Sequence, residues 1–439
     1  MKEKIKIGVV CLARNTYDVE AAIQLYKNTQ KELNEKKEYH WIIEKEVIIE
    51  DEDAIKSALK FKAEHIQALI LISGTFHLGT LALKYSQYLS VPILLWGYPE
   101  LPYDGGKIRL NSLCGVNLDA SNLYKANKKS FHASIRSTVD EAFLDAIKIQ
   151  YTLNQAHIGI IGHHAQGFYN IDVDELSIYH KFGILIDHYE LNDIFHMKEE
   201  EHDVEDYMIR IKKIFDLSDI NEAQLSKTAI LCAKIKKFYH QNKLDGLAIR
   251  CWPEFANGYG ISPCAAMSIL QGEEMLLACE GDIDGLISMM VHQALGLKTP
   301  FLADLSQIDQ GQNTMLLWHC GVAPITLWDG VSIRSLDTYF AQNRGLTTGF
   351  VLKQGHIELL RFDSVHGKYR IYTCEGTVIP MKKELRGTYA LVQLKVPVDE
   401  VFNKIVENGI AHHFSMSYGH VQEAIQIYGK LYNIPIIKC

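Results

Sequence analysis

The residues best suited to chemistry lie in the segment 276–304, LLACEGDIDGLISMMVHQALGLKTPFLAD. It reads as strand, helix, strand, and each strand ends on an acid, Glu280 after LLAC and Asp304 after PFLA. Ligands of open parallel α/β sheets bind outside the carboxyl ends of the strands. If the two strands are parallel neighbours joined by the helix, both carboxylates face one crevice, where they could hold a hard divalent cation or share acid and base roles. The alternative is two solvent-facing acids that cap the following helices.

Histidines could complete such a site. His319 lies in WHCGVAP, and His412, His413 and His420 cluster in GIAHHFSMSYGH. Carboxylates together with imidazole suit divalent Mn, Fe or Co. With 19 histidines in the chain, each of them is also explained as a surface or core residue. Strand alternation places His413 and Ser415 on one face and His412 on the other, so we expect only one of the adjacent pair to face the site.

Several weaker candidates follow other predicted strands. Glu254 ends the run GLAIRCWPEF, and Arg250 is a basic residue within the same apolar run, where it should pair with an acid or with an anionic group of a substrate. Phe168 follows another strand and could line the cleft. Asp282 and Asp284 are expected to cap and begin the helix after Glu280. The chain has no nucleophile elbow and no protein-kinase motif set.

Three regions with different patterns must position these residues. Residues 1–152 and 153–311 alternate apolar runs with amphipathic stretches, which predicts βαβ units and parallel sheets. Residues 312–439 show short strands between glycine turns, including a hairpin expected at Gln354-Gly355. The expected fold class is α/β, with two doubly wound parallel-sheet (Rossmann-like) domains followed by a β-rich, barrel-like C-terminal domain that carries His413.

The bulk composition excludes several classes of protein. Apolar content of 47% and charged content of 22% over 439 residues are ordinary for a globular protein. A net charge of −8 does not indicate the excess of positive charge with which proteins bind nucleic acid or an anionic membrane. No apolar run approaches the ~20 residues of a bilayer span. The start of the chain lacks a signal-peptide pattern, and the nine cysteines form no CxxC pair. We therefore expect a cytoplasmic protein with a small-molecule partner.

The chain resembles a known family of sugar isomerases. The segment 276–304 is similar to the region of the L-fucose and L-arabinose isomerases that supplies two metal-binding carboxylates, and the 24-residue separation of Glu280 and Asp304 is that of the fucose isomerase pattern. RLNSLCGVNLDA, IGIIGHHAQGFYNIDVDEL and GLAIRCWPEF resemble segments of the shorter fucose isomerase-like branch. GIAHHFSMSYGH resembles the C-terminal histidine element, in which His413 matches the metal ligand, and His319 falls where arabinose-type enzymes place another histidine.

The resemblance implies a divalent-metal-dependent aldose–ketose isomerase. Its substrate would be a free sugar of the fucose or arabinose type, or a 6-deoxy-6-sulfo hexose such as sulfoquinovose. Glu280 and Asp304 would be both metal ligands and the acid/base pair, and His413 the third ligand. The reaction would be a C1/C2 proton transfer through a metal-bound enediolate, with a hydride shift at the same metal left open. Mn²⁺ is the expected ion, and Co²⁺, Fe²⁺ or Mg²⁺ are alternatives.

Further expectations concern the surroundings of the metal. Arg250, Glu254, His319, Phe168 and Arg109 are expected substrate contacts. The family implies a homo-oligomer, trimer or hexamer, with active sites between subunits. The alternative function is a non-catalytic cytoplasmic sugar-binding protein, because paired α/β domains that flank a cleft also describe such proteins.

Overall fold

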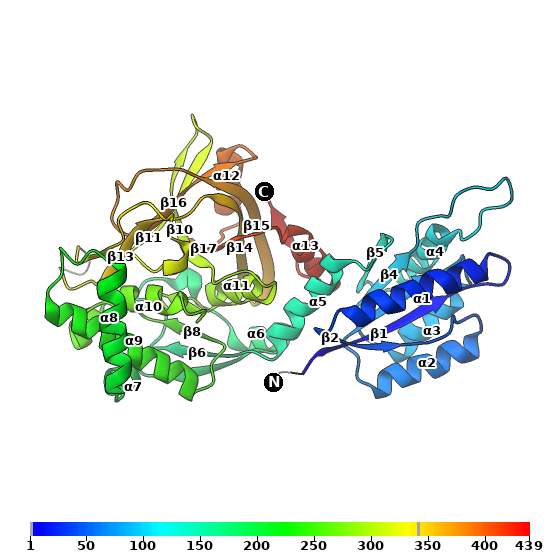
Figure 1. Ribbon diagram of the computed structural model, residues 1–439, viewed down its shortest axis with the longest axis horizontal. Helices are drawn as coiled ribbons and strands as arrows, with labels where there is room; N and C mark the ends of the chain where they lie inside the picture. The colour runs from blue at the N-terminus through cyan, green and yellow to red at the C-terminus, as the bar shows by residue number, and fades with distance from the viewer. Residues whose placement is uncertain (1–2, 340–342) are drawn as a thin grey trace. The chain divides into compact units, whose positions relative to one another are not determined.

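The computed structural model describes residues 3–339 and 343–439. Contacts divide the chain into two compact units, one formed by residues up to Tyr151 with Glu423–Ile434, the other by Thr152–Gln422 with Pro435–Cys439 (Figure 1). The second unit contains both the second α/β region and the β-rich region of the sequence analysis. The division into 1–152, 153–311 and 312–439 stays a prediction.

The first unit contains a parallel sheet with the strand order β2-β1-β3-β4-β5. Parallel strands covered by helices are buried on both faces, and β3 (ALILIS) is buried at every position. The strands are β1 (Ile5–Leu12), β2 (Tyr39–Ile43), β3 (Ala68–Ser73), β4 (Ile93–Gly97) and β5 (Phe131–Ile135). The helices are α1 (Val19–Glu35), α2 (Asp51–Ala63), α3 (Thr80–Tyr88), α4 (Ser112–Lys125), α5 (Glu141–Asn154) and, late in the chain, α13 (Gln422–Leu431).

The second unit contains another parallel sheet, with the order β7-β6-β8-β9. Its strands are β6 (His157–Ile161), β7 (Leu185–Tyr189), β8 (Gly246–Ile249) and β9 (Leu277–Cys279). Its helices are η1 (Tyr169–Ile171), α6 (Glu175–Phe182), α7 (Leu191–Phe195), α8 (Glu201–Ile214), α9 (Glu222–Gln241), η2 (Phe255–Tyr259), α10 (Cys264–Gln271) and α11 (Ile283–Ala294). The prediction of two parallel-sheet α/β regions is therefore confirmed.

A large mixed sheet completes the second unit, with the order β12-β13-β16-β11-β10-β17-β14-β15-β18. An additional pairing of β15 with β16 closes the strands from β16 to β15 into a ring, so the predicted barrel-like character is confirmed. The strands are β10 (Phe301–Asp309), β11 (Thr314–His319), β12 (Ser335–Asp337), β13 (Thr347–Val351), β14 (Gly355–Val365), β15 (Lys368–Ile379), β16 (Thr388–Leu394), β17 (His413–Tyr418) and β18 (Ile436–Lys438), with η3 (Ile325–Leu327) and α12 (Val398–Glu407) between them.

The expected parallel pairing of the two acid-bearing strands is wrong. β9 lies at the edge of the parallel sheet, whereas β10 pairs antiparallel with β11 and β17 in the mixed sheet. The connecting helix α11, IDGLISMMVHQA, is buried along most of its length. A helix that is apolar on every face needs a layer on each side. α11 therefore links two sheets rather than two strands of one sheet (Figure 1).

The hairpin expected at Gln354-Gly355 is also wrong. β13 pairs with β12 and β16, whereas β14 pairs with β15 and β17. The tight hairpin joins β14 to β15, where His366 (φ 50°) and Gly367 (φ 72°) are both left-handed. A type I′ turn requires this conformation at its two central residues. The turn therefore forms eleven residues beyond Gly355.

Two composition-based expectations can be compared with the structure. All nine cysteines are free thiols, and seven of them are buried. Within the described residues, no helix has both the length and the apolar character needed to cross a membrane.

Candidate metal and active site

The three residues expected to bind metal converge in the second unit. His413 Nε2 lies 3.4 Å from Glu280 Oε2 and 3.4 Å from Asp304 Oδ1. Two overlapping sets have ligand atoms within 4.8 Å of one another: Glu280 with His319 and His413, and Asp304 with His412 and His413. Carboxylates and imidazoles from β9, β10, β11 and the start of β17 thus surround one point.

Strand register explains how Asp304 meets His413. The two residues are direct partners in the antiparallel ladder of β10 and β17. Side chains of directly opposite residues project from the same face, with Cβ atoms about 4.5–5.5 Å apart. The pairing therefore places a carboxylate and an imidazole side by side although 109 residues separate them in the chain.

A left-handed turn aims Glu280 at the same point. Glu280 has φ 63° and Gly281 has φ 76°, directly after β9. A Cβ atom at Gly281 would lie 2.5 Å from the carbonyl oxygen of His163, so only glycine fits there. The backbone N–H of Ala165 donates to the Glu280 carbonyl (2.8 Å) and closes the turn against the loop after β6. A non-glycine residue in this region costs roughly 1–3 kcal/mol and persists where the surroundings enforce it.

The converging atoms lack ordinary hydrogen bonds. Glu280 Oε2, Asp304 Oδ1, His413 Nε2 and His319 Nε2 are all buried and have no hydrogen-bond partner among the described residues. The 3.4 Å separations exceed the ~2.7–2.9 Å of a charge-assisted hydrogen bond. They match the ~3.4 Å between neighbouring ligands of a four-coordinate ion held at ~2.1 Å. Since unpaired buried polar atoms are costly, this donor set fits a divalent cation.

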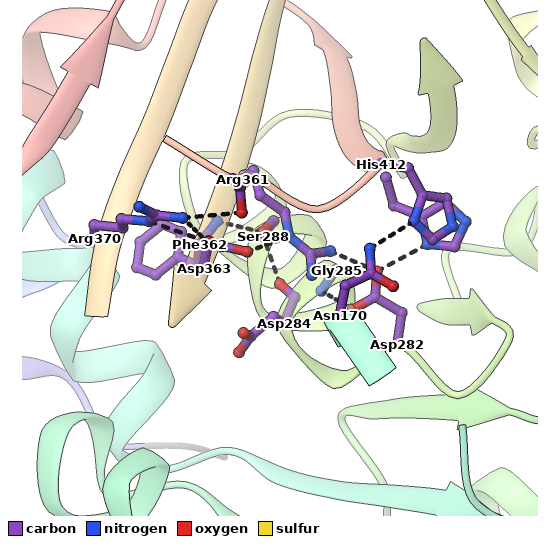
Figure 2. A network of polar contacts seen from close by, with 12 residues as sticks. Asn170, Asp282, Asp284, Gly285, Ser288, Arg361, Phe362, Asp363, Arg370 and His412 are labelled. Carbon is purple, nitrogen blue, oxygen red and sulfur yellow. Dashed lines mark hydrogen bonds and ion pairs between the residues drawn. The ribbon is translucent and has the colours of Figure 1, made fainter. Parts of the chain in front are cut away.

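Asp282 orients His413 from behind. His413 Nδ1 donates to Asp282 Oδ2 (2.9 Å), and Arg361 donates to the same oxygen (Figure 2). Asp282 Oδ1 accepts from the Gly285 N–H (2.8 Å), so Asp282 is the N-cap of α11, as predicted from the sequence. With Nδ1 as the donor, His413 directs its Nε2 lone pair at the two carboxylates. A carboxylate that orients a ligating histidine is a common partner in metal sites.

The pKa values of Asp282 and His413 are both shifted from their usual values. Burial would raise the pKa of Asp282, but the charges of Arg361 and His413 hold it well below the usual range. Burial would lower the pKa of His413, yet the hydrogen bond and charge of Asp282 raise it overall. A cation bound at Nε2 would therefore release a proton, as metal binding to histidine often does.

A buried network holds Asp282 and α11 against the barrel hairpin. Arg361 on β14 is fully buried, and Tyr369 on β15 donates to Asp284 Oδ1 (2.8 Å). Ser288 donates to the Asp284 carbonyl (2.7 Å) and accepts from the Phe362 N–H (2.8 Å) (Figure 2). Burial raises the pKa of Asp284 to about 7. Sequence patterns identify the cap but not this role, because no local signal links Asp282 to Arg361.

His319 differs from His413 in its hydrogen bonding. The backbone N–H of Cys320 donates to His319 Nδ1 (2.8 Å), so the ring proton of the neutral imidazole lies on Nε2. The His319 ring stacks on His413, with 5.4 Å between centroids and 26° between planes. His319 thus presents a hydrogen-bond donor to the centre, whereas His413 presents a lone pair.

His412 faces the site as well, contrary to the expectation from strand alternation. Its Nε2 lies 3.5 Å from Glu280 Oε2, its Nδ1 accepts from the Asn170 amide (3.1 Å), and its ring contacts Phe168 at 5.4 Å. β17 begins at His413, so the period of two does not extend to His412. Burial would raise the pKa of Glu280, but the neighbouring imidazoles lower it overall. Asn170 is a neighbour that the sequence analysis missed.

Comparison with known proteins shows what this chain is similar to. A family model described as "Fucose/sulfoquinovose isomerase, N-terminal domain" matches residues 8–152. A sulfoquinovose isomerase of Priestia aryabhattai is 28% identical over 437 residues, covering 97% of both chains. One of Alkalicoccus urumqiensis is 27% identical over 441 residues, covering 97% of this chain and 98% of the relative. The family model and these relatives together support a fucose isomerase-like family for this chain.

Solved structures add no argument to this fucose isomerase-like assignment. A periplasmic solute binding protein of Actinobacillus succinogenes with bound D-allose is 14% identical and covers 66% of this chain and 92% of its own. The TM-score is 0.19, too low to support a shared fold.

Two further expected residues of this fucose isomerase-like protein lie near the end of β8. Ile249 pairs with Cys279 in the parallel ladder, so Arg250 and Glu280 leave neighbouring strands at the same edge. Arg250 pairs with Glu254 at 3.1 Å, as expected for a basic residue in an apolar run. Arg250 Nε and Glu254 Oε2 are buried and have no hydrogen-bond partner in the described part of the chain.

Two other candidates lie elsewhere in the fucose isomerase-like chain. Arg109 belongs to the first unit, where its guanidinium donates to Asp18 at 2.7 and 2.9 Å, and its substrate contact stays a prediction. His420 stacks on His356, with 3.9 Å between ring centroids, in a different cluster of the second unit. Its cluster shares no ligand with the sets around His413.

Proposed function

We propose that this protein is a divalent-cation-dependent aldose–ketose isomerase and that its substrate is sulfoquinovose, a 6-deoxy-6-sulfo hexose. The observation that carries the proposal is the convergence of the buried, unpaired atoms Glu280 Oε2, Asp304 Oδ1 and His413 Nε2. The name of the relatives, sulfoquinovose isomerase, supports the choice of sugar. Both relatives align with this chain over nearly their whole length.

Glu280, Asp304 and His413 would hold the cation. Two carboxylate oxygens and one imidazole favour Mn²⁺, with Co²⁺, Fe²⁺ or Mg²⁺ as alternatives. When bound, the cation would polarise the sugar oxygens as a Lewis acid and offset the negative charge that develops during the reaction.

The side chains of the site would perform the proton chemistry. Moving a carbonyl between C1 and C2 requires removal of a weakly acidic proton from the carbon next to it. Glu280 and Asp304 would take this proton from one carbon and return it to the other, which typically contributes about 10²–10⁴-fold in rate. The lowered pKa of Glu280 keeps this carboxylate ionised and able to accept a proton. His319 would donate its Nε2 proton to a sugar oxygen.

Arg250 is the proposed contact for the sulfonate. Its guanidinium is planar and presents several N–H donors, a geometry that suits oxyanions. Glu254 pairs with one terminal nitrogen, whereas Nε has no hydrogen-bond partner among the described residues. Phe168, which contacts both His412 and Trp252, would cover an apolar face of the sugar. We further propose that the protein is a cytoplasmic homo-oligomer whose neighbouring subunit completes the site, which light scattering and mixing of inactive variants would test.

The deciding experiment follows the sugar in deuterated water. Metal-loaded protein is mixed with sulfoquinovose, and nuclear magnetic resonance measures ketose formation and deuterium, at C1 of the ketose and at C2 of the recovered aldose. We expect both, with glucose and L-fucose as comparison substrates and Glu280→Gln as the inactive control. Ketose without deuterium would favour a hydride shift. Sugar binding with neither ketose nor exchange, across a panel of aldoses and sulfonated aldoses, would support the alternative of a non-catalytic sugar-binding protein.

A further inference from the structure

A second set of metal-ligand side chains lies on the barrel hairpin of the second unit. His356, Glu375 and His420 have ligand atoms within 4.8 Å of one another. His356 and Glu358 come from β14, and Glu375 on β15 is the direct ladder partner of Glu358. His420 lies in the link between β17 and α13. We call these four residues the hairpin cluster.

The distances in the hairpin cluster resemble those of the candidate active site. His356 Nε2 lies 3.5 Å from Glu375 Oε1 and 4.0 Å from Glu358 Oε1. The rings of His356 and His420 are nearly parallel, with 14° between planes and 3.9 Å between centroids. Two imidazolium rings at this separation would repel each other.

Two buried atoms of the hairpin cluster have no hydrogen bond. His356 Nε2 and Glu358 Oε2 find no partner within residues 3–339 and 343–439. Glu358 is 1% exposed, and its Oε1 accepts from the Val421 N–H (3.2 Å), while Glu375 Oε2 lies 3.7 Å from Lys395. Glu358 thus uses one oxygen within the protein and leaves the other without a hydrogen bond among the described residues.

The two carboxylates of the hairpin cluster, Glu358 and Glu375, are direct partners across the ladder. Two carboxylates that face each other across a ladder repel unless a positive charge lies between them. Lys395 lies near Glu375 at 3.7 Å, and its side chain is largely exposed.

We propose that the hairpin cluster binds a divalent transition-metal ion, with Zn²⁺ preferred. Two imidazoles and two carboxylates are a typical four-coordinate zinc ligand set, and the 3.5 Å between His356 and Glu375 matches the ~3.4 Å expected between ligands held ~2.1 Å from the ion. Imidazole-rich sites bind Zn²⁺ more tightly than Mn²⁺. The ion would tie the link that carries His420 and Val421 to β14 and β15, a structural role.

Another histidine cluster is a weaker candidate. His163, His164 and Asp172 also have ligand atoms within 4.8 Å. However, His164 Nδ1 already lies 2.9 Å from the Ala165 carbonyl, and no unpaired buried atom occurs among these three residues, all of which the structure describes. The experiment below includes this cluster as a competitor.

The test measures metal content in untagged, full-length protein. Chelator-treated protein is loaded with Zn²⁺ or Co²⁺, dialysed, and analysed by mass spectrometry for bound metal, with the visible absorption of four-coordinate Co²⁺ as a second readout. We expect His420→Ala and His356→Gln each to lose one ion per chain relative to wild type. His413→Ala should retain that ion and its Co²⁺ spectrum. His40→Ala, an exposed histidine on β2, is the matched control and should lose nothing.

The outcomes separate this proposal from the proposed function. His420→Ala should leave sulfoquinovose turnover at saturating Mn²⁺ unchanged, and Zn²⁺ should raise the melting temperature of His413→Ala but not of His413→Ala/His420→Ala. Because His420 is exposed, its variant decides the matter even if His356→Gln fails to fold. The proposal fails if the ion survives both substitutions, or if His163→Ala removes it instead.

Discussion

Two buried histidine–aspartate pairs, one in each unit, have similar geometry. His77 Nε2 lies 2.9 Å from Asp119 in the first unit, and His413 Nδ1 lies 2.9 Å from Asp282 in the second. All four side chains are buried, and in both pairs the carboxylate raises the pKa of the histidine against the opposing effect of burial. The difference lies in the second ring nitrogen.

In the first unit the second nitrogen is satisfied by the protein. His77 Nδ1 lies 3.0 Å from the Thr75 carbonyl and 3.2 Å from Ser73 Oγ, so the ring pins the loop after β3. In the second unit His413 Nε2 faces two carboxylates and has no hydrogen bond within the described residues. A buried histidine–aspartate pair is therefore not by itself evidence of a functional site. The evidence is the unpaired Nε2 atom of His413 next to two carboxylates.

The largest effect should follow removal of one ligand charge. Glu280→Gln or Asp304→Asn should lower kcat about 10³-fold, equivalent to about 4 kcal/mol, because the variant loses both a metal ligand and a proton acceptor. Circular dichroism and the melting temperature should show a folded protein. Asp119→Asn, in the pair whose histidine has partners at both ring nitrogens, should retain activity. A rate within tenfold of wild type in either site variant would remove that residue from the mechanism.

The two pairs should respond differently when the aspartate is neutralised. Asp282→Asn should weaken metal binding by about 10–100-fold, because the orienting carboxylate of a ligand is lost. It should also reduce the free energy of unfolding by about 3–5 kcal/mol, because the fully buried Arg361 loses its nearest carboxylate partner and keeps only the longer contact with Asp363. Asp119→Asn should cost about 1–3 kcal/mol and leave metal affinity unchanged. Calorimetric titration and urea unfolding measure both quantities, and equal metal affinities in the two variants would contradict the comparison.

A smaller effect distinguishes the two stacked histidines of the site. His319→Phe keeps a ring against His413 but removes the Nε2 donor, so kcat should fall about tenfold, as expected for one neutral hydrogen bond. Metal affinity should remain within about twofold of wild type. If His319→Phe abolishes metal binding, His319 is a ligand and the hydrogen-bond assignment from Cys320 is wrong.

A third buried histidine provides a test, through the pH dependence of stability, of how the carboxylates change the pKa of the other two. Among the described residues, the ring of His292 has one hydrogen bond, between Nδ1 and the Ser415 hydroxyl (2.9 Å), and burial lowers its pKa to about 3. Below its unfolded pKa of about 6.5 the unfolded chain binds a proton that the folded chain does not. Stability should therefore fall by about 1.4 kcal/mol per pH unit between pH ~6.5 and ~3. Urea midpoints should show a flatter slope for His292→Gln, whereas His77→Gln, whose histidine has a raised pKa, should not flatten it. Parallel curves for wild type and His292→Gln would contradict this account.

Local patterns in the sequence determined much of this protein. Apolar runs alternating with amphipathic stretches predicted both parallel sheets, and glycine-separated short strands predicted the barrel-like region. The acid at a strand end, Glu280, and the cap Asp282 were both visible, because strand and helix ends have local signals. The resemblance to a family then selected His413 from several histidines, which composition and spacing alone left open.

Tertiary structure decided which residues meet. β10 could have paired with β9, but its ladder with β17 places Asp304 opposite His413. Arg361 reaches Asp282 across 79 residues, and His420 joins His356 on β14 rather than the site around His413 on the neighbouring strand β17. Strand partners and buried ion pairs depend on contacts distant in sequence, and the period of a strand is the same whichever neighbour it has. For that reason the chain alone indicated the chemistry, and only the fold assigned each side chain its partner.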